Sequence, residues 1–161
     1  MRLGIDVGKA RIGVARSDPH GMIATPIETV ARDADGVRDI ARIEAIANEY
    51  EAFEVVVGLP LNMRGERTLS TDDAENFAHA LAGRFGDCLE VRLVDERLST
   101  VSAQGQLRQA GKRTKESRSI IDQAAAVVIL QHALDIERSR DEAPGTLVHV
   151  RFDEESDGGS E

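Results

Sequence analysis

The stretch LGIDVGKARIGVARSD at residues 3–18 decides the fold of this chain. Apolar residues flank a short polar link, Lys9-Ala10-Arg11, that glycines bracket, and this pattern is typical of two antiparallel strands joined by a tight turn. Asp6 interrupts the first strand near its end. An ionised carboxylate in an apolar stretch is unfavourable unless a cation or hydrogen bonds compensate for it. Asp6 is therefore the first candidate for a metal or phosphate site.

The remaining sequence alternates between strand and helix patterns. Beyond the hairpin it predicts strands at 24–30, 53–58 and 89–94, and helices at 35–50, 70–85, 99–110 and 120–136. Pro26 favours a sheet edge for the third strand, and Asp35 is the expected N-cap of the first helix. The order predicts an α/β fold: a five-stranded mixed sheet, three antiparallel strands then two parallel ones, with helices on both faces.

Length and composition indicate one ordinary domain. The chain has 161 residues, of which 41% are hydrophobic, and we expect a single domain at 1–152 followed by a disordered acidic tail at 153–161. Only four phenylalanines and one tyrosine are present, so a base-stacking platform is poorly supplied.

The compartment is predicted from cysteine usage and apolar run length. The single cysteine, Cys88, cannot form an internal disulfide, and no run approaches the ~20 apolar residues of a membrane span. We expect a soluble cytoplasmic protein without a membrane partner. Cys88 itself is expected to be a small buried apolar residue, and the alternative is an exposed thiol able to link two chains.

The net charge of −9 argues at first against a nucleic-acid partner, because phosphate binding needs a positive field. Five of the acids lie in the tail at 153–161, however, and the segment 108–118 carries five bases and one acid. This basic segment fits either a phosphate contact or a solvated loop between two helices.

Acidic residues stand at three places where apolar residues would be favoured. They are Asp6, the pair Asp95-Glu96 at the end of the fifth strand, and Asp122 inside the helical run IIDQAAAVVIL. Carboxylates gathered at strand ends and closed by a helix aspartate suit one or two Mg²⁺ ions. Structural roles are the alternatives: a turn cap for Asp6, an ion pair for Asp95, and solvent exposure for Asp122.

Four motifs in order resemble the YqgF/RuvX family, Holliday-junction-resolvase-like proteins also described as pre-16S rRNA nucleases. They are GIDVGKARIGVARSD, VVVGLPLNMRGE, VDERLST and IIDQAAAVVIL. The resemblance implies an RNase H-like fold and metal-dependent hydrolysis of phosphodiester bonds. It further implies a role in maturing the 5′ end of 16S rRNA in ribosome biogenesis, with Mg²⁺ or Mn²⁺ as cofactor and Asp6, Glu96 and Asp122 as catalytic and metal-binding acids.

One departure from the wider RNase H-like pattern concerns the second carboxylate. The strand expected beside the first one ends in Gly58-Leu59-Pro60 and offers no acid, so the acid must come from the next strand, about 10 Å away. The longer Glu96 suits this span better than Asp95, which is a secondary candidate for orienting Arg97 or a metal-bound water.

Basic residues on the same sheet end are predicted to contact substrate phosphates. They are Lys9, Arg11, Arg64, Arg97, Lys112, Arg113, Lys115 and Arg118. Each has simple solvation as its alternative.

Rival functions fall into three classes. Holliday junction resolution on branched DNA is the main competitor, and it calls for a homodimer with two sites. A nucleotide-binding ATPase-like module also opens with an Asp-x-Gly hairpin, but the chain has no second glycine-rich phosphate loop. A non-catalytic RNA-binding module is the third alternative, and retention of all three acids disfavours it.

Overall fold

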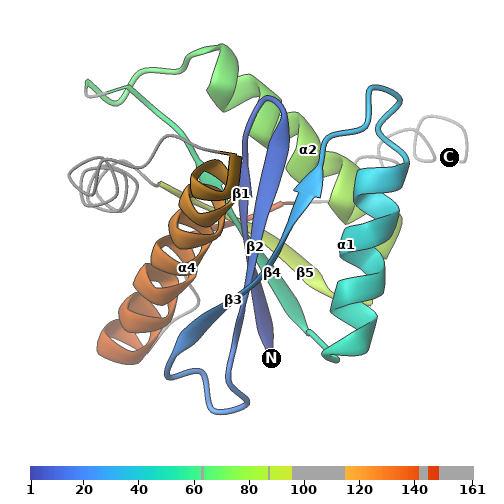
Figure 1. Cartoon of the computed structure of the whole chain (residues 1–161). Helices are drawn as coiled ribbons and strands as arrows, with labels where there is room; N and C mark the ends of the chain where they lie inside the picture. Colours follow the sequence, from blue (N-terminus) through green and yellow to red (C-terminus); the bar gives the residue numbers. More distant parts are fainter. Residues whose placement is uncertain (63, 87, 96–114, 142–144, 149–161) are drawn as a thin grey trace, which may run out of the picture.

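A six-stranded mixed sheet with helices against both faces forms the molecule (Figure 1). The computed structural model describes residues 1–62, 64–86, 88–95, 115–141 and 145–148, and for 115–122 it gives the helical backbone. The elements are β1 (Arg2–Val7), β2 (Arg11–Ser17), β3 (Ala24–Ala31), α1 (Arg38–Glu49), β4 (Glu54–Leu59), α2 (Leu69–Phe85), β5 (Glu90–Asp95), α4 (Lys115–Arg140) and β6 (Thr146–Leu147).

The strand order is β3-β2-β1-β4-β5-β6. β1, β2 and β3 pair antiparallel, and β1, β4 and β5 pair parallel, as the sequence predicts. The prediction of five strands is wrong by one, because the two-residue β6 adds antiparallel to β5. A strand this short has too few residues to show an alternating pattern.

The hairpin of β1 and β2 closes as expected. The backbone N–H of Gly8 donates to the carbonyl of Arg11 at 2.9 Å, and β1 pairs with β2 from Leu3 through Val7. β3 lies at the sheet edge, where Pro26 deprives no inner strand of a hydrogen bond.

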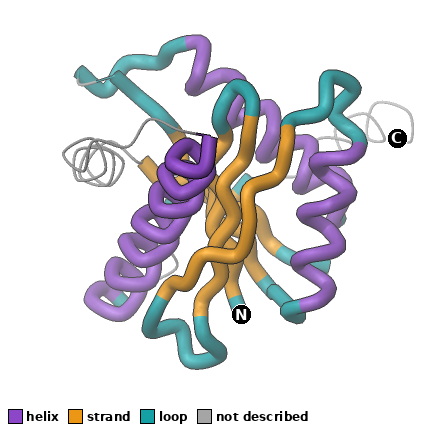
Figure 2. Tube along the Cα trace, viewed as in Figure 1, coloured by secondary structure: helices purple, strands orange, loops and turns teal. Residues whose placement is uncertain are grey.

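Two apolar cores cover the two faces of the sheet. Leu3 and Ile5 belong to the core under α1 and α2, whereas Val56 and Val94 pack against α4. In Figure 1, α4 lies to one side of the sheet and α1 and α2 lie to the other, and Figure 2 shows the same arrangement along the Cα trace. The prediction of helices on both faces is confirmed.

Two glutamines hold α4 against the edge strand β3. The Nε2 of Gln123 donates to Thr29 Oγ1 at 3.1 Å. Gln131 accepts from the backbone N–H of Ala24 at 3.0 Å and donates to the carbonyl of Met22, also at 3.0 Å. These contacts lie about 12 Å apart along the helix, at 1.5 Å per residue.

The start of α1 corrects one prediction. Asp33, and not Asp35, satisfies the first turn: its carboxylate accepts from the N–H groups of Val37 (3.2 Å) and Arg38 (2.8 Å). The intervening turn has Gly36 at φ 68°, so the chain reverses direction between the aspartate and the helix. The capping carboxylate therefore lies further back in sequence than a simple N-cap.

Other boundaries shift modestly. The capping residue of α2 is Thr68, which forms a reciprocal capping box with Thr71, so this helix begins slightly before the predicted 70–85. α4 is longer than the predicted 120–136. Cys88 is exposed, so the expectation of a buried cysteine is wrong. The predicted helix at 99–110 and tail at 153–161 lie outside the described residues.

A charged network occupies the end of the sheet opposite Asp6. Glu54 is buried, and its carboxylate accepts from Arg2 Nε at 2.8 Å and lies 3.2 Å from Arg92 Nε. Burial raises the pKa of Glu54, and the two arginines oppose that rise.

Among the described helices, none has the length and apolarity that crossing a membrane requires.

Candidate active site

Asp6 lies one residue before the end of β1 and is half-buried. Side chains alternate between the faces of a strand, and Leu3 and Ile5 lie in the core under α1 and α2. Gly4 and Asp6 therefore occupy the face that α4 covers. Across the sheet, Asp6 pairs with Gly13, which pairs in turn with Thr29.

α4 reaches the row of Asp6 through its N-terminal half. Gln123 contacts Thr29, which belongs to that row, while Ala126 and Leu130 lie over Gly4, two residues earlier in β1. α4 consequently runs opposite to β1. Position 122, next to Gln123, falls on the helical backbone at the level of Asp6.

The parallel strands beside β1 bring no acid to this row. Ile5 pairs with Val57, so Gly58 is the next position of β4 beside Asp6, and Gly58 pairs with Val94 of β5. This register agrees with the expectation that the neighbouring strand offers no carboxylate. The absence of a side chain at Gly58 leaves space between Asp6 and β5.

Asp95 ends β5 and is exposed. Val94 packs toward α4 and Leu93 packs toward the opposite core, so alternation assigns Asp95 to the face opposite Asp6. Glu96 lies outside the described residues. Within the described ranges, no three His, Cys, Asp or Glu side chains gather closely enough to hold a metal ion.

The predicted phosphate-binding residues divide by position. Lys9 is exposed in the turn between β1 and β2, Arg11 is half-buried at the start of β2, and Arg64 is exposed in the loop after β4. Positions 115 and 118 belong to the first turn of α4. Outside the described residues are Arg97, Lys112 and Arg113.

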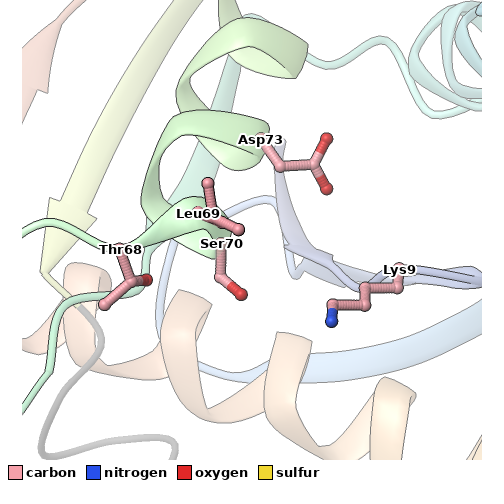
Figure 3. A pocket seen from close by; sticks show the side chains of 5 residues that line it. All are labelled: Lys9, Thr68, Leu69, Ser70 and Asp73. Carbon is pink, nitrogen blue, oxygen red and sulfur yellow. The ribbon is translucent and has the colours of Figure 1, made fainter.

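A cavity of about 500 Å³ separates the β1–β2 turn from the start of α2 (Figure 3). Its lining residues are Lys9, Thr68, Leu69, Ser70 and Asp73. In Figure 3 the Lys9 ammonium and the Ser70 hydroxyl extend toward each other across this space. Of these lining residues, Lys9 is the one for which the sequence predicts a substrate contact, and Ser70 and Asp73 fall in the helix predicted at 70–85.

Arg32 joins the walls of this cavity. Its guanidinium donates to both carboxylate oxygens of Asp73, at 2.9 and 3.1 Å, and to the carbonyl of Gly8 at 2.7 Å. The hydrogen bonds with Asp73 raise the pKa of Arg32 above its ordinary value. Sequence reasoning missed Arg32, since nothing in its neighbourhood distinguishes it from a surface arginine.

Comparison with known proteins agrees with this architecture. The family described as "RuvX: Holliday junction resolvase" matches residues 1–136. The chain belongs to this family. The resemblance that the four motifs indicate is thereby confirmed.

Several relatives carry the name "Putative pre-16S rRNA nuclease". The relative from Clavibacter michiganensis is 60% identical over 147 residues, which cover 91% of this chain and 90% of that protein. The relative from Leifsonia xyli is 55% identical over 152 residues (94% and 96%), and that from Mycobacterium tuberculosis is 58% identical over 134 residues (83% and 78%). The family description and these names agree on hydrolysis of phosphodiester bonds.

Solved structures confirm the RNase H-like fold. "T. thermophilus RuvC in complex with Holliday junction substrate" matches with a TM-score of 0.57 at 17% identity, covering 89% of this chain and 98% of that one. A second Thermus thermophilus RuvC structure matches with a TM-score of 0.50 at 18% identity, covering 91% and 99%. At such identities the likeness shows the fold alone.

Proposed function

We propose that this protein is a metal-dependent nuclease that matures the 5′ end of pre-16S rRNA. The supporting observation is that the N-terminal half of α4 lies at the level of Asp6. The hydrogen bond between Gln123 and Thr29 holds it there, because Thr29 lies in the same row of the sheet as Asp6. Family membership and the names of the relatives support the activity and the substrate. We place it in the cytoplasm, where ribosomes are assembled.

The catalytic acids in this proposal are Asp6, Glu96 and Asp122. Asp122 adjoins Gln123 on α4, and Glu96 follows directly after β5 in sequence. Since Asp95 belongs to the opposite face of the sheet, Glu96 is the acid of that pair retained for the site.

These residues fit a hard divalent cation. Carboxylate oxygens are the ligands that Mg²⁺ and Mn²⁺ favour, and the half-buried position of Asp6 beside Gly58 offers both a charge and room. A bound cation would act as a Lewis acid and lower the pKa of a coordinated water. The chain's own task is to hold the acids in place.

Basic residues bind the nucleic-acid backbone in this proposal. Lys9 lies three residues after Asp6, and Arg11 begins the next strand, so a phosphate near Asp6 lies within reach of the same turn. Arg64 and Arg97 follow β4 and β5, while Lys112, Arg113, Lys115 and Arg118 precede Asp122 in sequence. Contacts of this kind position the substrate and carry little sequence information.

Holliday junction resolution is the second candidate, and the family description favours it. A resolvase cuts two strands symmetrically, which requires a two-fold dimer. Size-exclusion chromatography with light scattering separates the candidates on this point, because a monomer is compatible with rRNA cleavage and not with paired incisions.

The test compares wild-type protein with Asp6→Asn and Asp122→Asn on precursor 16S rRNA and on four-way junction DNA. Reactions contain Mg²⁺, Mn²⁺ or EDTA. We expect rRNA cleavage by wild type with either metal, none in EDTA, and none by either variant. Asp135→Asn is the matched control, since Asp135 is an exposed residue of the same helix.

Contrary results are equally clear. Cleavage of the junction alone overturns the rRNA substrate, and cleavage in EDTA overturns metal dependence. Full activity of Asp122→Asn removes that residue from the site.

A further inference from the structure

Arg32 fastens the turn that carries Lys9. Its backbone N–H donates to the carbonyl of Ala10 at 2.9 Å, and its side chain donates to the carbonyl of Gly8 at 2.7 Å. One residue thus holds the turn at carbonyls on either side of Lys9. A lysine on a free hairpin turn would sample many positions, and fixing its backbone reduces that freedom.

The same side chain fixes the turn relative to α2. Both carboxylate oxygens of Asp73 accept from Arg32, and the guanidinium lies 5.4 Å from the centre of the Phe77 ring one turn further along α2. On its other side, Arg32 Nε is 3.6 Å from the buried carboxylate of Asp39 in α1. The side chain is only 22% exposed, so solvent screens these contacts less than those of a surface pair.

This arrangement sets the charge of the cavity. Lys9 and Asp73 are the two charged residues in its lining. Because Asp73 is engaged in a bidentate pair with Arg32, its negative charge is balanced from outside the cavity. Lys9 then gives the cavity a net positive character, with the hydroxyl of Ser70 beside it.

We propose that Arg32 is a positioning residue for substrate binding: by holding the β1–β2 turn against α2 and balancing Asp73, it directs Lys9 to a phosphate of the nucleic-acid backbone. This inference rests on the proposed nuclease function. It deepens that function by assigning the cavity of Figure 3 to the substrate strand and by naming a residue that acts through Lys9.

The test is a double-mutant cycle on RNA binding. Lys9→Gln, Arg32→Gln and the double variant bind a fluorescein-labelled precursor 16S rRNA fragment in EDTA, so that no cleavage interferes. We expect each single variant to weaken binding roughly three- to tenfold at low salt, as for loss of one charged contact. Each should also reduce the slope of log Kd against log salt concentration by about 0.7, the value for one phosphate on a single strand.

The double variant decides the matter. If Arg32 acts through Lys9, the losses are less than additive and the double variant binds close to Lys9→Gln alone. Additive losses overturn the proposal, whatever the salt slope of Arg32→Gln. Arg42→Gln is the matched control, because Arg42 also makes a bidentate pair, but its partner Glu28, unlike Asp73, does not line the cavity. Its RNA affinity should equal that of wild type.

Two further measurements keep the result interpretable. Arg32→Gln leaves the carboxylate of Asp39 without its cation, so thermal unfolding checks the fold. Should that variant unfold, Arg32→Lys replaces it in the same cycle, since lysine keeps a charge near Asp39 but lacks the planar fork. Cleavage by wild type is measured separately in Mg²⁺: if wild type binds RNA but never cleaves it, the proposed function fails while the cycle still judges Arg32.

Discussion

Gly4 allows the close approach of α4 to β1, and a methyl group at this position should disturb both stability and catalysis. A Cβ added at Gly4 would lie 2.6 Å from Leu130 Cβ and 2.9 Å from the carbonyl oxygen of Ala126. Neither atom can rotate away, because one is backbone and the other is the first atom of its side chain. The helix itself must therefore move in Gly4→Ala.

The size of the effect follows from these distances. An ordinary carbon–carbon contact is about 4 Å, so α4 must retreat by roughly 1.4 Å. Overpacking of this kind destabilises by about 1–3 kcal/mol, whereas replacing a strand glycine regains roughly 0.5–1 kcal/mol of backbone entropy. With midpoints of about 2 and about 0.75 kcal/mol for these two effects, the clash should win by about 1.3 kcal/mol. At about 2–4 °C per kcal/mol for a chain of this size, Tm should fall by about 3–5 °C.

Catalysis should suffer more than stability. Displacing a catalytic group by about 1 Å can reduce the rate on the order of 100-fold, and α4 carries Asp122, a catalytic residue in the proposed function. Circular dichroism melts and rRNA cleavage at 25 °C, where the variant is still folded, measure the two effects separately. Gly83→Ala is the matched control: a Cβ at this position in α2 meets nothing within 4 Å, so stability should rise by roughly 0.5–1 kcal/mol with activity unchanged. Wild-type Tm and activity in Gly4→Ala would refute the reasoning.

Three further predictions concern stability. Asp33→Ala should lower Tm at pH 7, whereas Asp35→Ala should not. Backbone hydrogen bonds lower the pKa of Asp33. The difference in Tm between wild type and Asp33→Ala should therefore vanish as pH falls below about 3.8. Burial raises the pKa of Glu54, so ionisation of Glu54 lowers the free energy of unfolding as pH rises above 4.5. In denaturant titrations between pH 4 and pH 7, the free energy of unfolding of Glu54→Gln should therefore increase relative to that of wild type. Thr71→Val should lose about 1–3 kcal/mol in urea unfolding, because the buried Thr71 hydroxyl donates to the carbonyl of Pro60 and accepts from Thr68 N–H; an unchanged midpoint contradicts this.

Much of the fold is encoded in short-range patterns. The glycines around the 9–11 link, the edge proline at 26 and the valine run of β4 each act within a few residues, and the strand order follows from them. Asp6 is predicted as a site residue in the same way, as a charged residue in an apolar strand, and the structure places it half-buried in β1. The expectation that the neighbouring strand ends without an acid also agrees with the observed register, in which Gly58 follows the Ile5–Val57 pair.

The rest depends on contacts that sequence spacing does not encode. Arg32 reaches Asp73 across 41 positions of the chain, and no local pattern marks either residue as a partner. The cap of α1 eluded the sequence for a related reason: a glycine turn carries Asp33 back to the helix start, so the nearer Asp35 looked like the cap. β6 is specified by its pairing with β5 and hardly by its own two residues.

The two glutamines of α4 attach the helix to the sheet at two separate points. A single attachment to β3 would leave the helix free to pivot, but attachments at Gln123 and Gln131 fix both its translation along the strand and its rotation about its own axis. Alignment of the helix at position 122 is therefore determined partly at Gln131, more than two turns away. A polar contact between α4 and the edge strand β3 thus helps to set the position of the end of the helix that carries the proposed catalytic residue Asp122.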